Sequence, residues 1–533
     1  MTSNHKGHKD HEGTHRRAGL LVPLFACPSA ASWGIGDIGD LPALTAWLAA
    51  AGMHVLQLLP INEMAPGQQS PYSAISAMAI DPLFIAVHLV PEFAALGGER
   101  VLDEEERAAL ARVRGAARIE YADIRRLKKV ALRAAFTRFF EAEWRRDSHR
   151  AGLLKAFLSE QAWWIEDYAL FRAIHAREDE RPWTQWTDVL QRREPGAIDR
   201  ARRDLSRDVL FQQYLQWIAD TQWKDARANA HGVQLFGDLP FMVDGDSADV
   251  WARQDQFRLD AAVGAPPDAF SATGQAWGMP VYRWDVIGAQ DFRWLCERAR
   301  RSADLYDGYR VDHLVGFYRT YGRPRNDGEA FFTPSDEAEQ EALGEYVLGI
   351  LGSAGAEIIA EDLGTVPDFV RASLARLGIP GFRVLRWERY WHTAGQPFRE
   401  PTEYPAVSVA ASGTHDTEPL VVWWNRAGED ERQKVNALDI VQRLTDGAGI
   451  LHAEQRTVRD VLLEALFASG SDLLVLPVQD VFGWQDRINE PATVTDVNWT
   501  FRLPWPCDRL DDIPEARERQ ETLRRFAEQY GRI

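Results

Sequence analysis

The sequence contains few cysteines: only Cys27, Cys296 and Cys507 occur in 533 residues. They are far apart and odd in number, so they form neither a disulfide framework nor the paired spacing of a zinc site. This composition fits a reducing compartment. The first residues also lack the apolar core of a secretory signal. We therefore expect a cytoplasmic protein.

Basic residues are in deficit as well. The formal net charge is −18 and the pI is about 5.3. Nucleic acids and anionic membrane surfaces attract positively charged proteins, so neither is expected as a partner. The charge balance suits a protein that acts on a neutral ligand.

Long apolar runs are missing too. The range 41–62 carries no Asp, Glu, Lys or Arg and comes closest to a membrane span. However, Gly52 interrupts it, His54 and Gln57 are polar, and Pro60 ends it. This pattern predicts a helix followed by a buried strand instead of a membrane span.

The chain divides by composition into a tail and one large domain. Residues 1–18 are polar and rich in histidine (His5, His8, His11 and His15), which predicts a disordered tail. The range 19–533 reads as a single domain. Within it, from about 85 to 207, Glu and Arg are dense and apolar residues recur every three or four positions, as in RLKKVALRAAFTRFFEAEW. This predicts a helical insertion.

Elsewhere, short strand-like runs alternate with helical patterns. The expected strands lie within 55–62, 233–243, 307–313, 356–362, 382–387, 406–416 and 472–480. Repeated strand–helix units predict an α/β fold: a (β/α)8 TIM barrel with helical and loop insertions and no separate C-terminal β domain. The range 264–284 reads as a long irregular loop, and such loops in compact domains are more often functional than idle.

Three acidic residues each follow an apolar run. They are Asp312 in YRVDHLVGF, Glu361 in EIIAEDLGTVP and Asp416 in SGTHDTEPL. They lie one or two strand–helix units apart, at roughly 30 residues per unit, and the carboxyl ends of barrel strands converge on one pocket. Converging carboxylates are what glycoside chemistry requires, one as nucleophile or stabiliser and one as proton donor.

The first two acids also have structural interpretations. Arg310 and Asp312 share one face of a strand, so the guanidinium can keep the carboxylate ionised, as a nucleophile requires; they could equally form a structural pair. Apolar surroundings would keep Glu361 protonated as an acid, but it could also begin a helix. Asp362 is the competing proton donor.

The motif around Asp416 also has a functional and a structural interpretation. Asp416 could accept hydrogen bonds from neighbouring sugar hydroxyls, and His415 could donate one. The alternative is a cap at the start of a proline-interrupted helix. The motif alone does not decide between them.

Together, these motifs resemble those of the 4-α-glucanotransferases (amylomaltases or disproportionating enzymes, glycoside hydrolase family 77), relatives of the α-amylases. The resemblance covers nearly the whole chain from Gly19. Besides the three acid motifs, it includes GIGDIGDL (34–41), SPYS (70–73), GDLPFMV (237–243), APPDAFSATGQAWGMPVY (265–282), LPVQDVFG (476–483) and RINEP…NW (487–499). The stretch at 265–282 is highly specific to that family.

The resemblance implies a retaining double displacement that transfers α-1,4-glucan segments. Asp312 would be the nucleophile, Glu361 the acid/base and Asp416 the transition-state stabiliser. The implied substrate-binding residues are Tyr72, Asp238, Trp277, Arg310, His415 and Asn498. The loop 264–284 would be a lid over the acceptor side. Maltooligosaccharides and other α-1,4-glucans would be the partners of a monomer or homodimer that needs no metal or other cofactor.

The sequence departs from the family pattern at a few positions. Val315 occupies a place where many members carry Arg, Ala269 follows PPD where Tyr is usual, and Met279 follows WG where Asn is usual. These departures concern the acceptor subsites and the lid. The three acids are unaffected.

Other functions remain compatible with parts of the sequence. An α-1,4-glucan hydrolase would use the same carboxylates and would differ only in that water, instead of a sugar, accepts the glucan segment. A non-catalytic glucan-binding protein would keep the fold without turnover. GIGDIG fits the letters of a dinucleotide motif, but it does not follow a convincing strand, so nucleotide binding is not expected.

Overall fold

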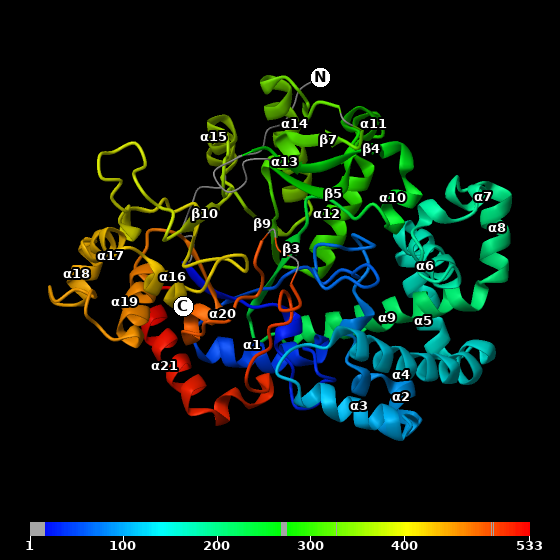
Figure 1. Cartoon of the computed structure of the whole chain (residues 1–533). Helices are drawn as coiled ribbons and strands as arrows, with labels where there is room; N and C mark the ends of the chain where they lie inside the picture. The colour runs from blue at the N-terminus through cyan, green and yellow to red at the C-terminus, as the bar shows by residue number, and fades with distance from the viewer. Residues whose placement is uncertain (1–15, 268–273, 327, 492, 494) are drawn as a thin grey trace, which may run out of the picture.

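A closed barrel forms the centre of the molecule. The computed structural model describes residues 16–267, 274–326, 328–491, 493 and 495–533. Eight parallel strands close in the order β1-β12-β11-β10-β9-β6-β3-β2 (Figure 1). The strands are β1 (Arg17–Leu21), β2 (Val55–Gln57), β3 (Gln234–Leu239), β6 (Gly308–Val311), β9 (Glu357–Ala360), β10 (Gly381–Val384), β11 (Ser408–Ala411) and β12 (Leu473–Pro477). The predicted (β/α)8 barrel is confirmed.

The first barrel strand begins inside the range predicted to be a disordered tail. Arg17 and Ala18 belong to β1, which pairs in parallel with β12 and β2 and so closes the barrel. The Arg17 guanidinium lies 2.8 Å from the Glu357 carboxylate at the start of β9. The ion pair with Glu357 compensates the charge of Arg17 within the strand. Because Arg17 is charged, the local sequence pattern did not predict that a strand begins there. The prediction for residues 1–15 lies outside the described residues.

Helices cover the outside of the barrel. They are α1 (Leu41–Ala50), α9 (Ser206–Ala228), α12 (Arg293–Leu305), α14 (Glu337–Ser353), α15 (Asp368–Leu377), α16 (Leu420–Arg426), α17 (Glu429–Asn436), α18 (Asp439–Leu444), α19 (Gln455–Phe467) and α21 (Pro514–Gln529), with the short helices α10 (Ala248–Ala252), α11 (Trp284–Ala289), α13 (Val315–Tyr318) and α20 (Val478–Phe482). The connection between β10 and β11 carries no α-helix. After β12, the described residues contain helices and turns and no strand.

The uncharged range 41–62 forms helix α1 and strand β2, as predicted. Gly52, with φ of +69°, provides the left-handed turn between them. Among the described helices, none has both the length and the apolar character needed to cross a membrane.

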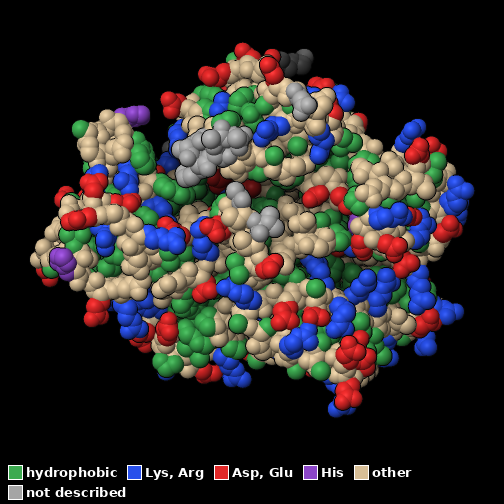
Figure 2. Space-filling view, in the orientation of Figure 1, with side chains coloured by type: hydrophobic (Ala, Val, Ile, Leu, Met, Phe, Trp, Pro, Cys, Tyr) green, Lys and Arg blue, Asp and Glu red, His purple; other side chains and the backbone are tan. Residues whose placement is uncertain are grey.

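A group of helices lies between β2 and β3. Its members are α2 (Pro91–Ala95), α3 (Glu104–Gly115), α4 (Tyr121–Ala142), α5 (His149–Glu160), α6 (Ala162–Arg177), α7 (Asp188–Gln191) and α8 (Pro195–Asp204), and α9 returns the chain to the barrel (Figure 1, right side). α3 begins with a reciprocal capping box between Asp103 and Glu106. Acidic and basic side chains are interspersed over the face in view (Figure 2).

A second, antiparallel sheet corrects the prediction of an irregular loop at 264–284. It consists of β4 (Phe257–Ala265), β5 (Gln275–Tyr282), β7 (Thr320–Pro324) and β8 (Phe331–Thr333), in the order β5-β4-β7-β8. β4 and β5 approach closely at Gly264, where a Cβ atom would lie 2.0 Å from the Gln275 carbonyl oxygen. Pairing with β4 makes β5 a strand despite its Gly and Pro content. Residues 268–273 lie outside the description.

Candidate active site

The three predicted acids lie beyond the carboxyl ends of three barrel strands. Asp312 directly follows β6, Glu361 directly follows β9, and Asp416 lies in the segment after β11. The strand order puts β9 beside β6 and separates it from β11 only by β10. The space-filling view shows a hollow near the middle of one face, with acidic side chains inside it (Figure 2). The fold therefore brings the acids to one end of the barrel.

Arg310 connects Asp312 to Asp238. On β6, Tyr309 faces outward and donates its hydroxyl to the Leu351 carbonyl at 3.0 Å, so the alternating Arg310 faces the barrel interior. Its Nη2 lies 2.7 Å from Asp312 Oδ1, and its Nη1 lies 2.6 Å from Asp238 Oδ2. This buried fork gives Asp312 a cationic partner and fixes the orientation of its carboxylate.

The Glu361 carboxyl group accepts hydrogen bonds from two backbone N–H groups, one of which belongs to the residue after Asp312. The His313 N–H donates to Oε2 at 2.8 Å, and the Leu363 N–H donates to Oε1 at 3.2 Å. Burial raises the pKa of Glu361 to about 7; the charge of Arg310 opposes this shift and that of Asp312 adds to it. The two carboxyl groups therefore share one site, and the raised pKa of Glu361 suits it to proton donation.

Asp362, the competing proton donor, has different neighbours. It is buried and accepts a hydrogen bond from the Phe382 N–H at 2.7 Å. It also pairs with Arg371 at 3.2 Å and with Arg383 at 3.3 Å. Its carboxylate is engaged by two arginines and a backbone N–H, so Asp362 suits a structural role, whereas the raised pKa of Glu361 suits proton donation.

Asp416 is fixed by groups from the segment that follows β12. The Asn489 amide donates to Asp416 Oδ1 at 2.7 Å, and the Arg487 guanidinium donates to its backbone carbonyl at 2.7 Å. His415 Nε2 lies 3.4 Å from Asp416 Oδ2, and burial lowers the pKa of His415, so its imidazole is neutral. No side chain caps the following helix α16, which argues against the helix-cap interpretation of this motif.

Tyr72 forms an aromatic wall with His415 and Trp499. The Tyr72 hydroxyl donates to Asp238 Oδ2 at 2.6 Å and lies 3.1 Å from His415 Nε2. The Tyr72 and His415 rings stack with centroids 5.4 Å apart, and the Trp499 ring centroid lies 5.8 Å from each of them. Rings that pack on one another in this way give a pocket a stiff apolar side.

Trp277 reaches the same region from the small sheet. It lies on β5, and its ring meets His313, the residue after Asp312, edge to face at 4.7 Å. The departures from the family pattern lie nearby in the chain: Met279 is on β5, and Val315 begins α13. Ala269 lies outside the described residues.

Asn498 differs from the other predicted site residues because its amide is turned into its own loop. Its Oδ1 accepts from the Glu490 N–H at 3.2 Å, and its Nδ2 donates to the carbonyls of Glu490 at 3.3 Å and Thr493 at 3.1 Å. Asn489, in the same RINEP…NW motif, binds Asp416 instead. Substrate binding by Asn498 stays a prediction, whereas Asn489 is the asparagine of this motif that contacts one of the three acids.

Sequence reasoning also missed other residues at the site. His313 was adjacent to a predicted acid, and Trp499 ended a quoted motif, so both had a signal in the sequence. Arg487 had the same signal as the first residue of that motif.

A buried network supports the segment that carries Tyr72. Glu63 lies just after β2, and its N–H donates to the Ala79 carbonyl at 3.1 Å. The Ile75 N–H in turn donates to the Glu63 carbonyl at 2.8 Å. Glu63 therefore holds both sides of the hairpin-like segment whose tip carries Tyr72.

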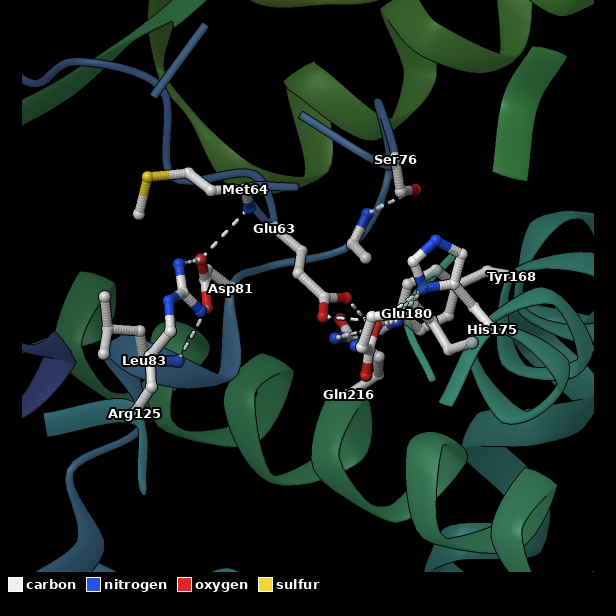
Figure 3. Close-up of polar contacts among 12 residues, drawn as sticks. Glu63, Met64, Ser76, Asp81, Leu83, Arg125, Tyr168, His175, Glu180 and Gln216 are labelled. Carbon is white, nitrogen blue, oxygen red and sulfur yellow. Dashed lines mark hydrogen bonds and ion pairs between the residues drawn. The ribbon is translucent and has the colours of Figure 1, made fainter. Parts of the chain in front are cut away.

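The Glu63 side chain anchors this segment to helix α6. Arg172 Nε donates to Glu63 Oε1 at 3.0 Å, and the Tyr168 hydroxyl donates to Oε2. Arg172 Nη1 also donates to Glu180 at 3.0 Å, which in turn lies 2.6 Å from His175 (Figure 3). The helical insertion thus fixes one wall of the candidate site.

We expect Arg172→Met to lower the free energy of unfolding by about 3–5 kcal/mol, because it leaves the Glu63 carboxyl group buried without its cation. Urea unfolding followed by tryptophan fluorescence measures the loss. Arg145→Met is the matched control: Arg145 pairs with Glu141 at 2.8 Å on an exposed helix face. This variant should change stability by less than about 0.5 kcal/mol. Equal losses in both variants would contradict a structural role for the network.

The site combines three differently held carboxyl groups. Asp312 is paired with a buried cation, burial raises the pKa of Glu361, and Asp416 is oriented by an amide. Such a set can form and break a bond at a sugar anomeric carbon. Within the described parts of the chain, no cluster of three or more His, Cys, Asp or Glu side chains is arranged to hold a metal ion.

Comparison with known proteins supports this interpretation. The model of the 4-alpha-glucanotransferase family matches residues 22–508. The 4-alpha-glucanotransferase of Thermus thermophilus is 32% identical over 523 residues, covering 95% of this chain and 99% of the relative. That of Synechocystis sp. is 33% identical over 518 residues, covering 93% and 95%. Among solved structures, the amylomaltase of Streptococcus agalactiae in complex with acarbose is 26% identical with a TM-score of 0.80, covering 97% of this chain and 99% of that one.

Proposed function

Because this chain belongs to the 4-alpha-glucanotransferase family (glycoside hydrolase family 77), we propose that it transfers α-1,4-glucan segments from a donor to a maltooligosaccharide or glucose acceptor. The observation that supports this most is the pairing of two unlike carboxyl groups. Asp312 pairs with the buried Arg310 guanidinium at 2.7 Å, while burial raises the pKa of Glu361 to about 7. A charged nucleophile beside a protonated acid is the starting state of a retaining reaction.

The first step forms a covalent intermediate. An Asp312 carboxylate oxygen attacks the anomeric carbon of the donor as the glycosidic bond breaks. Glu361 gives its proton to the departing glycosidic oxygen, which leaves as the 4-hydroxyl group of the released glucan. This step requires the carboxyl groups of Asp312 and Glu361 to lie roughly 5–5.5 Å apart.

The second step transfers the bound segment. Glu361, now a carboxylate, takes the proton from the 4-hydroxyl group of an acceptor glucan. The acceptor oxygen attacks the anomeric carbon and releases the Asp312 carboxylate. Transfer exceeds hydrolysis when the acceptor is positioned and water is excluded. The contact of Trp277 with His313 supports a role for β5 as a lid over this side.

The remaining site residues orient the sugar and stabilise its charge. Asp416, held by Asn489, is suited to stabilise the positive charge that develops at the anomeric centre. Tyr72 and neutral His415 provide an apolar surface with hydroxyl and imidazole groups at its edge. Asp238 is connected to this wall through Tyr72, so it belongs to the same subsite.

Incubation with maltotriose alone tests this function. We expect glucose together with oligomers longer than maltotriose, because each donor segment is passed to another sugar. Chromatography of the labelled products resolves the ladder. Glucose and maltose without longer products would contradict transfer and indicate an α-1,4-glucan hydrolase, whereas sugar binding without turnover would indicate a non-catalytic glucan-binding protein.

We also propose a cytoplasmic location. Cys27, Cys296 and Cys507 are all free thiols, as expected in a reducing compartment. Fractionation of cells that express the full chain tests this.

A further inference from the structure

Three large aromatic side chains are exposed in the segment that follows β10. Trp391 is 52% exposed, Tyr390 38% and Trp387 37%. Isolated exposed apolar residues are common, but aromatic residues gathered on one short surface segment indicate a binding surface. In Figure 1 this segment is part of the yellow loop that projects beyond β10.

The loop is held in a defined shape. Arg389 and Phe398 form an antiparallel backbone bridge, and the Tyr390 N–H donates to the Pro397 carbonyl at 3.0 Å. The Tyr390 hydroxyl donates to Glu403 at 3.0 Å. A ring that is already fixed loses little conformational entropy when a ligand covers it.

Arginine side chains support the exposed rings. The Arg389 guanidinium lies 4.1 Å from the centroid of the Phe398 ring and 5.6 Å from that of Trp391, and it pairs with Glu431 on α17. The Arg399 guanidinium lies 5.3 Å from the centroid of the Tyr390 ring and 4.0 Å from Glu388. Because the arginines beside both rings have acidic neighbours, the surface suits an uncharged ligand more than an acidic or basic peptide.

The loop rises from the same end of the barrel as the catalytic acids. It follows β10, which lies between β9 and β11 in the barrel. Glu361 follows β9 and Asp416 follows β11, so the loop starts between the segments that carry them.

We propose that Tyr390 and Trp391 form an outer binding site for long α-1,4-glucan chains. Glucose rings present apolar C–H faces that pack against aromatic rings, and burying such surfaces is favourable without any charge. The inference rests on the proposed function for its ligand class. The site is separate from the acids, so it affects the affinity for long chains and leaves the reaction itself unchanged.

The test compares Trp391→Ala with the wild-type enzyme on long amylose and on maltotriose. We expect the KM for amylose to rise about 5–10-fold, because loss of an aromatic contact residue costs about 1 kcal/mol or more. The kcat, and both constants for maltotriose, should stay within about twofold. Native electrophoresis in amylose-containing gels measures binding directly, and Trp391→Ala should be retarded less. Trp391→Phe, which keeps an aromatic ring, should restore most of the retardation.

Tyr346→Ala is the matched control for loss of an exposed aromatic residue. Tyr346 lies on α14, is 55% exposed and packs on Phe292 at 4.8 Å. An unchanged KM and retardation in Trp391→Ala, or equal changes in Tyr346→Ala, would overturn the proposal. The proposal would also be overturned if Trp391→Ala changed the molecular mass of the protein in solution and left its affinity for amylose unchanged. That result would indicate that Trp391 contacts a second copy of the chain. If the wild type makes no transfer products from maltotriose but its retardation depends on Trp391, the outer site stands and the proposed function fails.

Discussion

Asp312→Asn should abolish transfer, with kcat on maltotriose falling by at least about 10⁴-fold. The amide cannot form the covalent bond to the anomeric carbon that the first step requires. Asparagine has nearly the same shape, so substrate binding should persist and KM should change little by comparison. Discontinuous assay of the oligomer ladder over long incubations gives the remaining rate.

The fold should survive this substitution. Arg310 keeps its partner Asp238 at 2.6 Å, so no buried cation is left alone. Circular dichroism and thermal unfolding of Asp312→Asn should therefore resemble those of the wild type. Asp285→Asn is the matched control, because Asp285 is exposed and forms a surface pair with Arg283 at 3.4 Å. It should keep full activity, and retained activity in Asp312→Asn would contradict the assignment.

A trapping experiment separates a nucleophile from a residue that only supplies charge. In Glu361→Gln, a maltotriosyl fluoride donor should still react, since fluoride leaves without a proton, and the resulting intermediate should break down slowly. Mass spectrometry of the digested protein should find the added sugar on the peptide that contains Asp312. A label on a peptide that contains Asp416 instead would reverse the two roles.

The strands predicted best from the sequence are those barrel strands that are buried on both faces. In 55–62 and 472–480, continuous apolar runs reflect burial on both faces, which is typical of parallel strands. The strands β1 and β5 lacked this signal. β1 contains Arg17, which depends on Glu357, far away in the chain, and β5 exists because it pairs with β4. Pairing partners of this kind are not visible in a local pattern.

The same distinction explains which site residues were predicted. Asp312 and Glu361 end their strands, so the barrel geometry alone brings them together. The contact of Asn489 with Asp416 was not predicted, because it depends on how the loop after β12 folds over Asp416.

The support beneath Tyr72 was also invisible in the sequence. Glu63 and Arg172 are 109 residues apart, one after a barrel strand and one in the helical insertion. No periodicity connects such positions. Buried ion pairs of this kind become apparent only when the packing of the insertion on the barrel is known.

Glu361→Gln should lower the rate of transfer from maltotriose by about 10²–10⁴-fold, because the leaving oxygen loses its proton donor. The loss should be much smaller for the formation of the covalent intermediate from maltotriosyl fluoride. Stopped-flow measurement of fluoride release in a single turnover separates the two donors. Equal losses with both donors would contradict a role in proton donation.

The pH dependence of the wild type gives a second test of the same residue. Burial raises the pKa of Glu361 to about 7, so the group is protonated below that pH and charged above it. For maltotriose, kcat/KM should therefore fall as the pH rises through about 7. With the fluoride donor, intermediate formation should lack this alkaline limb, because it does not need the proton.

The cause of the raised pKa can be tested through its neighbour. The charge of Asp312 contributes to raising the pKa of Glu361, whereas the charge of Arg310 lowers it. Asp312→Asn removes the first influence and keeps the second, so the pKa of Glu361 should fall. Carbon-13 NMR of glutamate-labelled protein, with Glu361→Gln used to assign the signal, measures the change. A pKa that stays constant or rises in Asp312→Asn would contradict the contribution of the Asp312 charge to the raised pKa of Glu361.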